Sequence, residues 1–147
     1  MPFSNGAPNV SAEDIPLMII LSAPMTRAVM TALSDEFSRR IISSTVDRGK
    51  TIQEISLEQA VPRSTCYRRA SDLANHGLLV VERIMVTDDG KRYAVYRSSF
   101  RSVQMASELG VISATATLNV DVADKFHRLW AKSGRTDNDP SPDRWPR

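Results

Sequence analysis

The chain has 147 residues, of which 41% are hydrophobic and 24% charged, and its formal net charge is +2. This length suits one domain with appendages and a single sizeable core. The only cysteine, Cys66, excludes a disulfide framework and a thiolate metal cluster. The apolar run 17–21 is far shorter than the ~20 residues of a membrane span, and the N-terminus lacks the basic-then-apolar pattern of a signal peptide. We therefore expect a cytoplasmic protein.

Positive charge is concentrated in the middle of the chain. Residues 1–61 hold five basic and seven acidic residues, a net charge of −2, whereas residues 62–101 hold eight basic and four acidic residues, a net charge of +4. The remaining residues hold six of each. This distribution indicates a polyanionic partner for the central segment.

The first third of the chain is predicted to form a flexible arm followed by helices. Residues 1–14 are rich in Pro, Gly, Ser and Asn, which predicts a flexible arm. Residues 15–21 are apolar and either start a helix or cover a sheet edge. Beyond Pro24 the pattern predicts a helix over residues 25–33.

A second helix is expected after Ser34, which we interpret as its N-terminal cap. Asp35 and Glu36 then occupy the first turn, where carboxylates meet the positive end of the helix dipole. Gly49 is expected to end this helix. Its core-facing stripe consists of Phe37, Ile41, Ile42 and Val46.

Residues 51–54 (TIQE) form a capping box, in which Thr51 and Glu54 each close one unpaired backbone amide. A short helix begins there and must end before Pro62, because the residue that precedes a proline is pushed out of helical geometry. This helix is expected to bury Ile52 and Ile55.

A helix is predicted over residues 62–76, and the other predicted elements are arranged around it. At helical spacing Cys66, Ala70 and Leu73 share one face, and Gly77 marks the end. The opposite face carries cations, hydroxyl groups and an aromatic ring, which suit guanine edges and phosphate oxygens. Its members are Arg63, Ser64, Tyr67, Arg68 and Ser71. An ordinary solvated helix face would have the same composition.

A β-hairpin is predicted directly after this helix. The runs 79–86 and 92–97 are strand-like and flank an Asp-Gly turn, with Lys91 and Arg92 at the tip. Two helices joined by a few residues form a helix-turn-helix arrangement. Together with the hairpin they predict an α+β fold, a winged helix-turn-helix domain over residues 15–99.

The residues in this region resemble winged-helix regulators of the ArsR type, in particular their archaeal branch. The resemblance covers about half of the chain and rests on the motifs ALSD (32–35), RRII (39–42), TIQEI (51–55), STCYRRASDLANHGLL (64–79) and the strand 93–96. It implies a homodimeric, sequence-specific DNA-binding transcriptional regulator, with helix 62–76 in the major groove and wing 80–97 on the flanking backbone. The residues implied to contact DNA are Arg63, Ser64, Thr65, Tyr67, Arg68, Arg69, Lys91 and Arg92.

This sequence departs from the resemblance at two informative positions. Metal-sensing members carry several cysteines near the recognition helix, whereas this chain has only Cys66 on the predicted core face, so a metal sensor of that type is not expected. Pro62 stands where the family usually has a hydroxyl cap for the recognition helix.

A C-terminal extension is predicted over residues 100–132. Residues 100–107 and 112–119 form a second hairpin turned at 108–110, and residues 120–130 form an amphipathic helix with Val122, Phe126, Leu129 and Trp130 on one face. That face must be buried on its own domain or on another subunit, and we favour a subunit contact and dimerisation. Residues 133–147 have the composition of a disordered tail.

No pattern typical of catalysis or of a bound cofactor occurs. His76 and His127 lack neighbouring ligands at metal-site spacing, and a phosphate loop and a nucleophile elbow are missing. We expect neither an enzyme nor a membrane partner. Two alternatives stay open: a winged-helix module that binds proteins without reading DNA, and a ligand-responsive sensor whose pocket lies between the second hairpin and the last helix.

Overall fold

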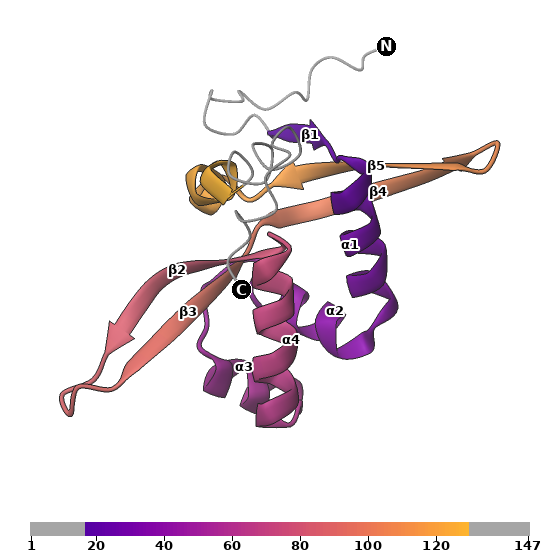
Figure 1. Cartoon of the computed structure of the whole chain (residues 1–147). Helices are drawn as coiled ribbons and strands as arrows, with labels where there is room; N and C mark the ends of the chain where they lie inside the picture. Colours follow the sequence, from indigo (N-terminus) through magenta and orange to yellow (C-terminus); the bar gives the residue numbers. More distant parts are fainter. Residues whose placement is uncertain (1–16, 130–147) are drawn as a thin grey trace, which may run out of the picture.

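The computed structural model describes residues 17–129 (Figure 1). The predicted arm 1–14, the tail 133–147 and Trp130 lie outside these residues. The described part is a mixed α+β fold of helices and two antiparallel sheets. Its elements are β1 (Met18–Ile20), α1 (Ala23–Ser34), α2 (Glu36–Ser44), α3 (Ile52–Gln59), α4 (Arg63–Asn75), β2 (Leu79–Val86), β3 (Arg92–Ser98), β4 (Phe100–Glu108), β5 (Val111–Leu118) and a final helical segment over 120–129. None of the described helices is long and apolar enough to cross a membrane.

The residue that caps the start of α2 lies one position after the predicted one. The side chain of Asp35, not that of Ser34, accepts the hydrogen bond from the Ser38 N–H (2.8 Å). The Ser34 hydroxyl donates instead to the carbonyl of Thr31 in the last turn of α1 (2.7 Å). The prediction that Ser34 caps α2 was therefore wrong, because Ser34 still belongs to the preceding helix.

The end of α2 also differs from the prediction. The helix stops at Ser44, where the Thr45 N–H bonds to the Ile42 carbonyl, five residues before Gly49. Gly49 serves a different purpose. A Cβ atom at this position would lie 2.7 Å from a methyl group of Val95 and 2.8 Å from the Glu82 carboxylate, so only glycine allows the base of the β2–β3 hairpin to come this close.

The predictions for α3 and α4 are confirmed except at one residue, because Ile55 is buried as expected whereas Ile52 is only partly buried. The side chains and amides of Thr51 and Glu54 form the reciprocal capping box at the start of α3. Helix α4 begins one residue after Pro62, which supplies no capping side chain. Its last residue is Asn75, and the φ of +83° at Gly77 lets the Leu78 N–H reach back to the Leu73 carbonyl (2.9 Å).

One continuous core joins the helices to both sheets. Its centre contains Ile41 of α2 and Ile55 of α3, both 0% exposed, and the three residues predicted for the inner face of α4. Those residues, Cys66, Ala70 and Leu73, are all buried. The predicted inner face of α4 is thus confirmed, and the opposite face must be exposed.

Both predicted hairpins are present, and they project from opposite sides of the body (Figure 1). Strands β2 and β3 form a two-stranded sheet, and β1, β5 and β4 form a second sheet in that order. The apolar stretch around β1 covers a sheet edge, which was one of its two predicted roles. Because β1 pairs with β5, the sheet crosses the predicted domain boundary at residue 99.

The last helical segment packs on its own chain. Val122 and Phe126 are 2% and 1% exposed, and the Phe126 ring makes an edge-to-face contact with Phe100, with centroids 5.2 Å apart. The preference for a subunit contact was therefore wrong for this part of the face, because Phe100 at the start of β4 already covers it. Leu129 stays 40% exposed.

Candidate functional site

The outer face of α4 presents the predicted polar residues to solvent. Arg68 lies opposite the buried Cys66–Leu73 face, and Ser64 is exposed beside it. Tyr67 is 63% exposed and stands on the flank nearer β3. Within the described residues, Arg68 has no hydrogen bond or ion pair to another side chain, so its guanidinium is available to an external acceptor.

Arg63 and Thr65 are less available than Arg68. The Arg63 guanidinium donates to the Gln53 side chain on α3 (2.9 Å), which fixes its position at the start of α4. Thr65 is half-buried. Arg63 can still donate from its remaining N–H groups, because a guanidinium carries five.

Arg69 points away from the exposed face. Its Nε and an Nη atom contact the Asp35 carboxylate at 3.1 and 3.3 Å, and both side chains are about one-third exposed. The bond from the Ser38 N–H, opposed by desolvation and assisted by Arg69, holds the pKa of Asp35 below its usual value. Arg69 therefore ties α4 to the start of α2, and the structure separates it from the other predicted DNA contacts.

The exposed face of α4 includes residues that the sequence reasoning did not name. Asn75 follows Arg68 by seven residues, two helical turns, and is exposed on the same side. Helical spacing was the signal that could have identified it. Asp72 is also exposed nearby, so the positive character is concentrated in the first half of α4.

The tip of the β2–β3 hairpin holds the two predicted cations together with two carboxylates. Lys91 and Arg92 are exposed, and Lys91 lies 3.9 Å from Asp89. The Thr87 hydroxyl donates to Asp89, which keeps the pKa of that carboxyl below its usual value. With Asp88, the formal charge of the tip is zero. The expected basic tip is therefore a patch of mixed charge.

The base of the same hairpin is held by a buried arginine. The Arg97 side chain is 8% exposed and donates to the Val46 carbonyl (3.0 Å), Glu82 (2.8 Å) and Asp121 (2.8 Å). Lys125 of the last helix donates to the carbonyls of Val81, at 3.0 Å, and Glu82, where β2 carries a bulge. These bonds fix the direction in which the hairpin leaves the body relative to α4.

Cations beside α3 are neutralised. The Lys50 ammonium contacts Glu58 at 2.6 Å, and Arg48 lies 3.6 Å from Glu54 and 3.5 Å from Glu58. The bond from Lys50 keeps the pKa of Glu58 below its usual value. The cations beside α3 therefore contribute no uncompensated positive charge to the surface next to α4.

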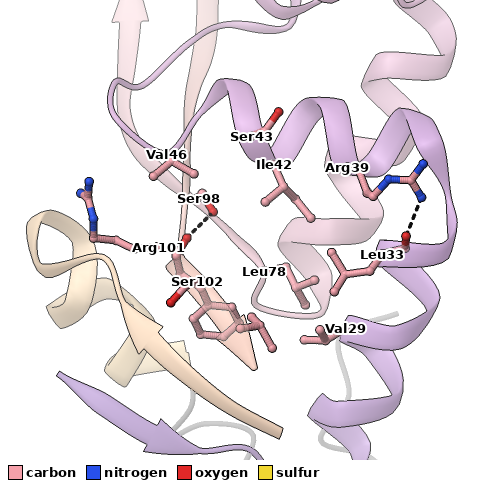
Figure 2. Close-up of a pocket in the computed structure, with 12 residues that line it drawn as sticks. Val29, Leu33, Arg39, Ile42, Ser43, Val46, Leu78, Ser98, Arg101 and Ser102 are labelled. Atoms are coloured by element: carbon pink, nitrogen blue, oxygen red, sulfur yellow. Dashed lines mark hydrogen bonds between the residues drawn. The ribbon is translucent and has the colours of Figure 1, made fainter. Parts of the chain in front are cut away.

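A separate cavity of about 330 Å³ opens between α1, α2 and the start of β4 (Figure 2). Its wall is apolar and comprises Val29, Leu33, Ile42, Val46, Leu78, Phe100 and Val103. At the rim, Arg39 donates to the Leu33 carbonyl (2.6 Å). The sequence reasoning placed a pocket between the second hairpin and the last helix. This cavity borders the hairpin but is closed on its other sides by α1 and α2.

The two histidines have local roles in the structure. His76 Nδ1 lies 2.8 Å from the Asp72 carbonyl at the end of α4, and the His127 ring contacts Phe126. Across residues 17–129, no three His, Cys, Asp or Glu side chains gather as a metal site would require. Comparisons with models of protein families, with curated proteins and with solved structures find no match to this chain. Function is therefore inferred from the geometry described above.

Proposed function

We propose that this protein is a sequence-specific DNA-binding transcriptional regulator of the winged helix-turn-helix, ArsR-like type that acts as a homodimer. The observation that carries the proposal is the position of Arg68. Its unpaired guanidinium lies at the centre of the exposed face of a helix whose opposite face is fully buried. A guanidinium presented in this way can bond both acceptor atoms of a guanine edge.

The position of α4 among its neighbouring elements also supports the proposal of DNA binding. Helix α4 follows α3 after three residues, 60–62, and packs against α2, α3 and β2. In the proposal α4 enters the major groove, where Arg68, Ser64 and Asn75 face base edges. Arg63 and Tyr67 lie on the side of the groove nearer the β2–β3 hairpin, which acts as the wing. Arg69 is not among the DNA contacts because Asp35 holds it.

The proposal is tested by a salt titration of binding to random duplex DNA and to genomic fragments selected with the protein. A regulator is expected to show a steep salt dependence and to bind at least one fragment ~10³-fold more tightly than random duplex. Equal binding to all duplexes would indicate an architectural role, and no binding at low salt would contradict the proposal.

Two substitutions separate base reading from phosphate contact. Arg68→Ala is expected to weaken binding to the selected fragment by ~1–3 kcal/mol and to leave random-duplex binding nearly unchanged. Lys91→Ala is expected to weaken both alike and to reduce the salt slope. Arg27→Ala, which removes an exposed cation from α1, is the matched control and should alter neither. Equal loss on every duplex after Arg68→Ala would exclude Arg68 from base reading.

A protein-binding module is the alternative that one observation favours. Leu57 on α3 is 76% exposed, and Tyr67 is 63% exposed on α4. Exposed apolar and aromatic side chains are typical anchors of protein interfaces. Absence of DNA binding at low salt, together with loss of a protein partner after Leu57→Asn, would support this alternative.

A further inference from the structure

The cavity between α1, α2 and the start of β4 has the size of a small-molecule site. Protein interiors leave few spaces larger than a water molecule, and an unfilled space lowers stability. This cavity, at about 330 Å³, lies at the lower end of the range for ligand pockets. It is roughly twice the size of a cavity of ~150 Å³ that holds benzene, so about a dozen carbon atoms fit inside it.

The side chains that enclose the cavity suit an apolar ligand better than water. Figure 2 shows Val29 and Leu33 of α1, Ile42 of α2 and Leu78 around one common space. An ordered water needs about two to four polar partners, which this part of the wall does not provide. The part of a ligand that enters the cavity must therefore be apolar.

The rim of the cavity carries positive charge. Among the described residues that line it, the ionisable ones are Arg39 and Arg101, and none is acidic. The Arg101 guanidinium is directed away from the cavity and contacts Asp47 at 3.3 Å. The Arg39 guanidinium lies beside Leu33, where one N–H group donates to the backbone carbonyl (2.6 Å). Its other N–H groups can bind a further acceptor, because a guanidinium carries five.

The carboxylates closest to Arg39 in the sequence are bound by other arginines. Asp35 contacts Arg69 at 3.1 Å, and Glu36 contacts Arg40 at 2.6 Å. Within the described part of the chain, Arg39 itself forms no ion pair. A carboxylate matches the fork of N–H donors on a guanidinium. An anionic group on a ligand in the cavity would therefore find its partner at the rim.

One wall of the cavity is connected to the end of α4. Leu78 lines the cavity and is 3% exposed, and its N–H donates to the Leu73 carbonyl in the last turn of α4 (2.9 Å). The Leu78 carbonyl accepts a bond from the Ser99 N–H (2.9 Å), directly before β4. A ligand that fits one position of Leu78 better than another would shift α4 by that difference in affinity.

We infer that the cavity binds a carboxylate with an apolar body of about ten carbon atoms, and that this ligand alters DNA binding. The apolar body fills the space between α1, α2 and β4, and the carboxylate bonds to Arg39 at the rim. Binding of the ligand is independent of the proposed function, whereas its effect on DNA rests on that function.

The experiment measures binding of three probes to the full chain by isothermal titration calorimetry. Decanoate and 2-naphthoate supply a flexible and a flat apolar body, and decyltrimethylammonium carries the opposite charge. At least one carboxylate is expected to bind with a Kd of about 0.1 mM or lower, and about tenfold or more tightly than the cation. Failure of both carboxylates to bind, or equal affinity for the cation, would overturn the inference.

Substitution at the rim tests the anchor of the carboxylate. Arg39→Ala is expected to weaken carboxylate binding about tenfold or more and to leave the affinity for decyltrimethylammonium unchanged or higher. Arg27→Ala removes an exposed cation of α1 that does not line the cavity, and it is the control expected to change neither affinity. Equal losses in the two variants would show that general positive charge, not Arg39, attracts the carboxylate.

A second pair of variants tests the location. Leu33→Trp places a large ring in the mouth of the cavity and should abolish carboxylate binding. Met30→Trp introduces the same ring on the same helix outside the cavity and should leave binding unchanged, since Leu33 and Met30 are 36% and 39% exposed. Circular dichroism checks that both variants fold. Wild-type affinity in a folded Leu33→Trp variant would overturn the inference.

The effect on DNA is measured with the selected genomic fragment. Saturating carboxylate should change its affinity about fivefold or more in the wild type, compared with an equal concentration of sodium chloride, and should have no effect in Leu33→Trp. An unchanged affinity would overturn the regulatory part of the inference. A chain that binds DNA but no carboxylate would overturn the inference and leave the proposed function intact. A chain that binds the carboxylate at Arg39 but no DNA would support the site and contradict the proposed function.

Discussion

The two hairpins of this protein have similar lengths and opposite surface chemistry. Strands β2 and β3 have 8 and 7 residues, and β4 and β5 have 9 and 8. The first hairpin ends in charged residues around Asp88–Arg92 and is anchored by a buried arginine, Arg97. The second ends in Leu109 and Val111, and the arginine at its base, Arg101, is half-exposed.

The difference shows how hairpins with similar backbones are adapted to different surroundings. A charged tip on a rigidly held base is stable in water and suits contact with a polar surface such as a phosphate backbone. An apolar tip on a weakly held base is unfavourable in water and becomes favourable when it is covered. Three arginines form ion pairs that range from buried to exposed: Arg97 with Glu82 and Asp121 in the first hairpin, Arg69 with Asp35 between α4 and α2, and Arg101 with Asp47 at the second hairpin. This series can be tested by substitution.

The largest effect is expected for Arg97→Ala. The substitution removes the donor of three hydrogen bonds and leaves the Val46 carbonyl and the Glu82 carboxylate without it. We expect a loss of about 2–4 kcal/mol in the free energy of unfolding, measured by urea denaturation. Arg92→Ala on the same hairpin is the exposed control and should change stability by less than about 0.5 kcal/mol. Equal stability losses for Arg97→Ala and Arg92→Ala would show that Arg97 does not anchor the base of the β2–β3 hairpin.

Gly49→Ala is expected to have the next largest effect. The added methyl group would lie 2.7 Å from a side-chain carbon of Val95, which is 1% exposed and cannot move freely. We expect a loss of about 1–3 kcal/mol. In the double variant with Val95→Ala, the loss should be smaller than the sum of the two single losses, because the clash is removed. Strict additivity would argue against the close approach.

Asp35→Ala should have an intermediate, pH-dependent effect. Loss of the helix cap and of the Arg69 partner should cost about 1 kcal/mol at pH 7. The pKa of Asp35 is lower in the folded than in the unfolded chain. Its contribution is therefore complete above the unfolded pKa of about 3.9 and is lost as pH falls through the folded value.

Urea denaturation between pH 2 and 7 should consequently show the difference from wild type shrinking below about pH 4. Ser34→Ala, which changes the neighbouring residue, is the control because Ser34 does not cap α2. A larger effect for Ser34→Ala than for Asp35→Ala would restore the sequence-based assignment of the cap.

The smallest effect is expected for Asp47→Ala. Asp47 is 87% exposed where it meets Arg101 at 3.3 Å, so water screens the pair. Urea denaturation should give a change below about 0.5 kcal/mol. A loss comparable to that of Arg97→Ala would mean that the base of the β4–β5 hairpin is as firmly held as that of the β2–β3 hairpin.

Features fixed by neighbouring residues could be predicted from the sequence. The capping box of α3, the glycine that ends α4 and the turns of both hairpins each depend on a few consecutive residues with known backbone preferences. The inner face of α4 followed from helical spacing, and so did the exposure of Arg68. For these elements the local and the overall structure agree.

Features fixed by distant contacts could not be predicted. Arg69 looked equivalent to Arg68 until Asp35, 34 residues away in sequence, was found beside it. The apolar face of the last helix was expected to need a second subunit. Helical spacing cannot show that Phe100, which belongs to a strand, packs against Phe126 of that helix. The cavity is bounded by three separate elements, and its apolar residues read in the sequence as ordinary core.

The pairing of β1 with β5 has a consequence for synthesis of the chain on the ribosome. The Leu118 N–H donates to the Leu17 carbonyl (2.7 Å), so a strand made early bonds to one made about a hundred residues later. The four helices and the first hairpin can assemble from nearby segments while translation continues. The sheet of β1, β5 and β4 cannot close until residue 118 has emerged. During that interval Leu21, which is 6% exposed in the folded chain and bonds to the Ala114 carbonyl, is open to solvent and available to chaperones.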